Sequence, residues 1–167
     1  MKLIKSLSKV LLISSTLLAF SCAPQPKSVD FSVNQNEIKI GIEEGGKFTK
    51  KDDKTFVASD KIILKFRASG LTIKQSKIKT NIDMFLKRGP DILGTQNDIL
   101  GADGITQIIP NIDTNYTGTA GEADLQLTIL PPSETVGEMT VNVTVKDLNS
   151  IGKILTFETK FTLKAKS

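Results

Sequence analysis

Hydrophobic residues recur at every second position in several stretches of the chain. Val141, Val143 and Val145, for example, alternate with Asn142 and Thr144. This period of two is typical of a strand with one buried and one solvated face, so it predicts antiparallel strands. Such stretches occur at residues 38–42, 62–66, 71–73, 125–129, 141–145 and 155–163, and turn residues separate them at 44–46, 69–70, 131–132 and 149–152.

The strand pattern predicts an all-β fold, an antiparallel β-sandwich formed by residues 31–167 as a single domain. Two packed sheets bury one face of each strand, so the apolar positions of the alternating stretches predict the core. The predicted core consists of Ile38, Ile40, Ile62, Leu64, Phe66, Leu127, Ile129, Val141, Val143, Val145, Phe157 and Phe161.

Residues 81–88 depart from this pattern and predict one short helix. Asn81 is a candidate N-cap, and Thr80-x-x-Asp83 resembles a capping box. The pair Gly89-Pro90 would end the helix. The sandwich is therefore expected to contain at most one or two short helices, this one with an apolar face formed by Ile82, Phe85 and Leu86.

Residues 89–121 are the least regular part of the chain and include a repeated Asp-Ile-Leu-Gly at 91–94 and 98–101. One hypothesis is an irregular insertion or loop that binds a partner, because connections often carry function and this one contains the only tyrosine, Tyr116. The alternative is that part of it forms further strands, with residues 105–109 paired into the sheet. Loops of this length are uncommon inside compact domains, which favours the alternative.

The N-terminus has the order of an export signal. Residues 1–9 carry three lysines and no acid, and residues 10–20 are almost wholly apolar. This apolar run is too short to span a bilayer as a helix, which needs about 20 apolar residues. Residues 1–21 are therefore predicted to be a cleaved signal peptide.

The signal ends at Ala19-Phe20-Ser21-Cys22, and Cys22 is the only cysteine of the chain. This segment resembles the relaxed lipobox of spirochaetal lipoproteins, with Phe20 as a departure from the usual small residue. The resemblance implies that Cys22 is lipidated and becomes the first residue of the mature protein. Residues 22–30, which contain two prolines, would form a lipidated tether. The implied location is the cell membrane or outer membrane, with the domain periplasmic or surface-exposed.

The stretch from Gly137 to Asp147 resembles the penultimate strand of bacterial immunoglobulin-like domains of the PKD and cadherin-like kind. Their pattern is Gly-x-Tyr-x-Val-x-Val-x-Val-x-Asp, and Met139 replaces the tyrosine here. The resemblance implies an immunoglobulin-like sandwich, and it implies nothing about function because such domains serve many roles.

Four oxygen-bearing residues have the spacing of a calcium-binding loop. Asp113, Asn115, Thr117 and Asp124 fall at positions 1, 3, 5 and 12 of an EF-hand, and Gly118 stands at position 6. The sequence therefore offers calcium as a candidate cofactor. The same residue types are also common in ordinary turns, which remains the competing interpretation.

Composition excludes several kinds of chemistry. Because the chain has no histidine and one cysteine, Ser-His and Cys-His pairs, imidazole metal sites and an internal disulfide are all excluded. Removal of Lys2, Lys5 and Lys9 with the signal changes the balance from 22 basic and 18 acidic residues to 22 − 3 = 19 against 18. This near-neutral balance argues against a nucleic-acid partner. The lysine-rich stretch 47–54 is either a patch for anionic glycans or headgroups, or a solvated hairpin tip, and the second is favoured.

These observations predict a membrane-anchored envelope or surface lipoprotein that is not an enzyme. It would act as a binding or structural module, held to the membrane by its lipid and able to contact a protein or glycan partner. The alternative is an exported calcium-binding module or calcium-dependent hydrolase that uses residues 113–124.

Overall fold

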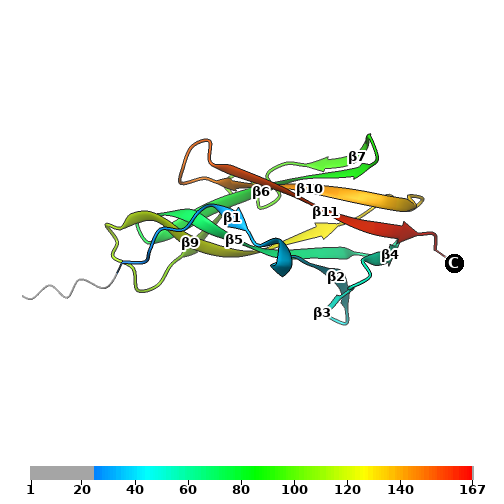
Figure 1. Ribbon diagram of the computed structural model, residues 1–167, viewed down its shortest axis with the longest axis horizontal. Helices are drawn as coiled ribbons and strands as arrows, with labels where there is room; N and C mark the ends of the chain where they lie inside the picture. Colours follow the sequence, from blue (N-terminus) through cyan, green and yellow to red (C-terminus); the bar gives the residue numbers. More distant parts are fainter. Residues whose placement is uncertain (1–24, 167) are drawn as a thin grey trace, which may run out of the picture.

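The computed structural model describes residues 25–166 (Figure 1). These residues form eleven strands and one short 3₁₀ helix, η1. The elements are β1 (Ser32–Val33), η1 (Gln35–Glu37), β2 (Lys39–Glu44), β3 (Lys47–Lys50), β4 (Thr55–Val57), β5 (Ile62–Lys74), β6 (Lys77–Arg88), β7 (Asp91–Gln96), β8 (Ile105–Ile108), β9 (Thr117–Ile129), β10 (Gly137–Asp147) and β11 (Ile154–Lys164).

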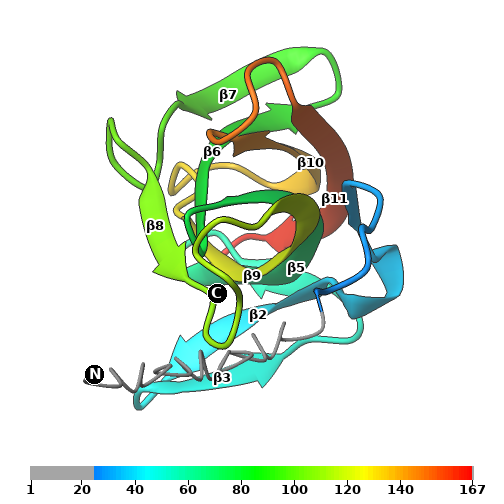
Figure 2. The same cartoon turned by 90° about the vertical axis from the view of Figure 1, so that its left-hand side faces the viewer.

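The strands form two layers that face each other (Figures 1 and 2). In one layer β5 pairs with β9 on one side and with β1 and β2 on the other, and β3 extends β2. In the other layer β6 pairs with β10, which pairs with β11, and β7 and β8 lie along the free side of β6. The long β5–β6 hairpin joins the layers at the single pair Lys74 and Lys77. Every strand pair is antiparallel except that of β4 with β11, so the predicted all-β antiparallel sandwich is confirmed.

The core lies between the layers, where the alternating apolar positions meet. Phe66 of β5 and Phe157 of β11 pack edge to face across it, with ring centroids 4.9 Å apart. Ile38 is half-buried and packs against the margin of the core. The other predicted core residues are all buried, as the period of two required: Ile40, Ile62, Leu64, Phe66, Leu127, Ile129, Val141, Val143, Val145, Phe157 and Phe161.

The helix predicted at residues 81–88 is wrong, because these residues belong to β6. The side chains of Ile82, Met84 and Leu86 alternate into the core, at 0%, 5% and 4% exposure. β10 pairs with β6 from residue 80 to 87, and this continuous ladder provides more backbone hydrogen bonds than a two-turn helix could. The strand period of Ile82, Met84 and Leu86 therefore decides the local structure.

Three strands account for nearly half of residues 89–121. β7 and β8 pair with successive halves of β6, and β9 begins at Thr117. Ile105 to Ile108 pair with Thr80 to Lys77, which matches the alternative that this segment adds strands to the sheet. Two connections remain, residues 97–104 and 109–116.

Residues 26–31 run along the domain, where the sequence predicts a tether. The backbone N–H of Val29 donates to the carbonyl of Thr119 at 2.9 Å, and the Tyr116 hydroxyl donates to the carbonyl of Pro26 at 3.0 Å. Gly70, with φ of 78°, permits this approach, because a Cβ there would collide with the backbone of Asp30. Residues 1–24, which include the predicted signal peptide and Cys22, lie outside the described residues.

Candidate functional site

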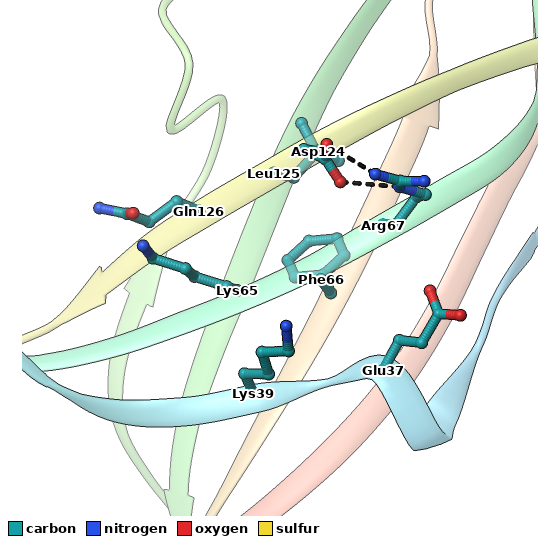
Figure 3. A pocket seen from close by; sticks show the side chains of 8 residues that line it. All are labelled: Glu37, Lys39, Lys65, Phe66, Arg67, Asp124, Leu125 and Gln126. Atoms are coloured by element: carbon teal, nitrogen blue, oxygen red, sulfur yellow. Dashed lines mark hydrogen bonds and ion pairs between the residues drawn. The ribbon is translucent and has the colours of Figure 1, made fainter. Parts of the chain in front are cut away.

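An open groove of about 560 Å³ lies on the outer face of the β2–β5–β9 layer (Figure 3). The strands place its side chains by register, because Lys65 of β5 stands opposite Lys39 of β2 on one side and Gln126 of β9 on the other. Alternate residues of each strand face outward, so the polar positions of three strands meet on one surface. The groove is lined by Glu37, Lys39, Lys65, Phe66, Arg67, Asp124, Leu125 and Gln126.

One end of the groove is fixed by a two-bond ion pair between opposite residues of β5 and β9. Arg67 donates from Nε to one carboxylate oxygen of Asp124 at 2.8 Å and from Nη2 to the other at 2.9 Å (Figure 3). These hydrogen bonds lower the pKa of Asp124 and raise that of Arg67. Both groups are therefore charged at neutral pH and neutralise each other, and the pair weakens only as acid protonates Asp124.

The middle of the groove carries two ammonium groups without a carboxylate partner. Within residues 25–166, neither Lys39 nor Lys65 forms a salt bridge, and the Lys65 ammonium lies 4.5 Å from the centre of the Phe48 ring. Cation–π contact holds a lysine in place without neutralising its charge. The two ammonium groups are not neutralised by a direct ion pair, although Glu37 lines the same groove and the charge of Lys39 helps to lower the pKa of Asp124.

The β2–β3 hairpin forms a wall beside the two lysines. Gly41 permits the close approach of β3, because a Cβ there would collide with the backbone of Thr49. Ile63, which points away from the main core, is 1% exposed, and with Phe48 it helps to line a second hollow of about 180 Å³. Lys65 and Gln126 border both hollows, so the groove continues toward the hairpin.

The residues that line the groove are mostly charged or polar. They include no serine, threonine, cysteine or histidine that could act as a nucleophile beside a base. The two lysines and the amide of Gln126 supply donors that match carboxylate, sulfate or hydroxyl oxygens. These donors share the groove with the carboxylates of Glu37 and Asp124.

The structure does not bring the predicted calcium ligands together. Asp113 accepts a hydrogen bond from the backbone N–H of Asn115 at 2.8 Å, which makes a local turn. Thr117 begins β9, and Asp124 lies seven residues farther along that strand, roughly 20 Å away at the usual rise per residue. The EF-hand spacing requires a loop where the chain forms a strand, and Asp124 is already bound to Arg67. Among the described residues no group of three or more acidic, histidine or cysteine side chains could hold a metal ion.

The lysine-rich stretch 47–54 forms β3 and the turn after it. Lys50 is 2.6 Å from Asp52, and both side chains are more than half exposed. This geometry matches the solvated hairpin that the sequence favoured. Lys39, Lys65 and Gln126 occupy polar positions of predicted strands, and only the strand register, which the sequence does not reveal, brings them together.

No protein-family model and no curated protein sequence matches this chain. Within the described part of the chain, no helix is long and apolar enough to cross a membrane.

Proposed function

We propose that the protein is an envelope or surface lipoprotein, anchored through Cys22, whose sandwich is a non-catalytic binding module. The observation that carries this proposal is the position of the only cysteine, directly after an export signal and a small residue, Ser21. Two or three acyl chains on that cysteine give stable attachment, whereas one gives only marginal binding. The absence of histidine from the chain supports a binding role over a catalytic one.

Metabolic labelling with radioactive palmitate tests the anchor. The wild-type chain should incorporate label and partition into the detergent phase, and Cys22→Ser should do neither. Ser15→Ala, within the signal, serves as a control that should leave labelling unchanged. Equal incorporation into wild type and Cys22→Ser would contradict lipidation at this residue.

The groove is the part of the module that we propose contacts the partner. Its unpaired Lys39 and Lys65 favour an acidic polymer, such as a glycan that carries carboxylate or sulfate groups, because an extended ligand can follow the three strands. The fixed Arg67–Asp124 pair would border the ligand and limit where negative charge is accepted.

Binding of heparin, used as a sulfated polysaccharide probe, should weaken about thirtyfold in the double variant Lys39→Gln, Lys65→Gln, since each of the two lost charged hydrogen bonds removes on the order of 1 kcal/mol. The matched control is Lys164→Gln, Lys166→Gln, which removes the same charge from exposed positions at the C-terminal end of the chain. Isothermal titration of the detergent-solubilised chain at two salt concentrations measures both. If the two variants lose the same affinity, the groove is not the binding site.

A further inference from the structure

The N-terminal segment is fixed to one end of the sandwich. Pro26 receives the Tyr116 hydroxyl, and Val29 is bonded to Thr119 at the start of β9. In Figure 1 the described chain begins beside the loop that precedes β9, at the end opposite the C-terminus. We call this the anchor end, formed by residues 26–29, the β5–β6 turn at 74–77 and the connection 109–116.

The anchor end is held together by several short contacts. The backbone N–H of Ile109 donates to the carbonyl of Ser76 at 2.8 Å, and the Ser76 hydroxyl donates to the carbonyl of Ile112 at 3.2 Å. Nearby, the amide of Asn149 in the β10–β11 turn donates to the carbonyl of Lys77 at 2.9 Å. These bonds join the loops of this end to each other and to β6, so the loops hold fixed positions relative to one another.

The distance between this surface and a lipid on Cys22 is limited by chain length. Four residue steps separate Cys22 from Pro26, and a fully extended chain covers at most about 14 Å over that length. The headgroup layer of each leaflet has a thickness of several ångströms. A lipidated Cys22 would therefore keep the anchor end within reach of the bilayer surface.

The chemistry of the anchor end suits an anionic bilayer. Lys27, Lys74 and Lys77 are exposed, and none of them forms a salt bridge within the described residues. Asp113 is the only acid in these three segments. Ile108, the strand partner of Lys77, is 68% exposed at the edge of this surface.

The far end of the molecule is chemically different. Its loops include the β6–β7 turn and residues 130–136, which contribute both signs of charge: Arg88 and Asp91 flank the turn, and Glu134 lies in the second loop. The attraction between positive charge and anionic headgroups falls off within a Debye length, so the anchor end, with three lysines and one acid, combines short reach with an excess of positive charge.

We propose that the anchor end is a membrane-contact surface, which lies on the anionic bilayer that holds the lipid of Cys22. Lys74 and Lys77 would face the headgroups, and Ile108 would enter the interface beside them. This inference rests on the proposed lipidation, and it adds a fixed orientation in which the far end points away from the bilayer. The domain would then be docked on the membrane by its own surface as well as by its lipid.

Site-specific quenching can detect this orientation in the full-length lipidated chain. A fluorophore is attached to a new thiol at Asn115→Cys, in the anchor end, or at Ser133→Cys, in the far end, since both positions are exposed. The chain is placed in vesicles of phosphatidylcholine and phosphatidylglycerol that contain a headgroup spin label. Fluorescence at residue 115 should fall about twofold or more, and fluorescence at residue 133 should not change, because the two ends differ in their distance from the bilayer.

Charge removal gives the second arm of the experiment. In the Asn115→Cys background, Lys74→Gln with Lys77→Gln should reduce quenching, and Lys164→Gln with Lys166→Gln should leave it unchanged. Quenching that is equal at both ends, stronger at residue 133 or absent from both would overturn the orientation. Palmitate content of the same sample separates the two proposals: without lipid on Cys22 both fail, and with lipid but no quenching at residue 115 only the orientation fails.

Discussion

Replacement of Asp147 by alanine is expected to lower the free energy of unfolding by about 3–5 kcal/mol, the range seen when a buried charged partner is removed. The Asp147 side chain has 0% exposure, and it lies where β10 enters the turn before β11. It accepts hydrogen bonds from the backbone N–H of Thr72 at 2.8 Å and of Asn149 at 3.1 Å. The Lys153 ammonium lies 3.5 Å from the same carboxylate.

The expected loss is large because the substitution leaves buried donors without acceptors. Asp147 connects the β10–β11 turn with the end of β5, so its removal also frees contacts between the two layers. Equilibrium urea denaturation, followed by far-UV circular dichroism, measures the change. Asp124→Ala is the control: that carboxylate is 74% exposed in an ion pair with Arg67, and its loss should change stability by less than about 1 kcal/mol. Similar losses in the two variants would contradict the role assigned to Asp147.

The layers of the sandwich could be predicted from sequence because burial imposes a period of two. In β5 the residues Ile62, Leu64 and Phe66 are buried as expected. The prediction was wrong at residues 81–88, where a helical pattern and a strand pattern overlap. In β6 the residues Ile82, Phe85 and Leu86 have helical spacing, yet Met84 completes an equally good strand pattern with Ile82 and Leu86. Only pairing with β10, which is distant in the sequence, selects the strand.

The groove could not be predicted from sequence because it depends on register between distant segments. Arg67 and Asp124 are 57 residues apart, and their bond requires that β5 and β9 pair at one particular offset. A shift of β9 by one residue would place Asp124 on the opposite face of the sheet from Arg67. The alternation of polar residues was visible in each strand, but the partners across the strands were not.

A lysine holds the β7–β8 connection against β6 and remains charged at neutral pH. The Lys146 ammonium is 2.7 Å from Asp83 and 3.0 Å from Asp98, and the hydrogen bond with Asp83 raises its pKa. Because the folded-state pKa is raised, this contribution to stability is complete below the normal lysine pKa and is lost only as pH rises through the raised value. Lys146 therefore keeps its ion pairs with Asp83 and Asp98 when variants of nearby residues are measured near pH 7.

Asn81, which the sequence predicts as a helix cap, also holds the connection at residues 97–104 against β6. Its side chain is buried at 0% residue exposure and donates to the carbonyl of Gly101 at 2.7 Å and to Asp98 at 3.1 Å. Its amide oxygen accepts from the backbone N–H of Leu100 at 3.1 Å and of Ile82 at 2.8 Å. Asparagine side chains readily form hydrogen bonds with free backbone groups, and Asn81 does so with the connection at residues 97–104.

Asn81→Ala is expected to lower the free energy of unfolding by about 2–4 kcal/mol, because it removes four hydrogen bonds and leaves backbone groups of residues 100 and 101 without their partner. Hydrogen exchange should also become faster in residues 97–104, whereas the amides of β10 and β11 should change only in proportion to global stability. Asn142→Ala is the matched control, since that asparagine is half-buried on β10 and its side chain forms no hydrogen bond within residues 25–166. Urea denaturation measures the free energy of unfolding of both variants, and hydrogen–deuterium exchange measures the local effect at residues 97–104. An Asn81→Ala protein as stable as Asn142→Ala, with unchanged exchange at residues 97–104, would show that the connection is held by Lys146 and by backbone bonds alone.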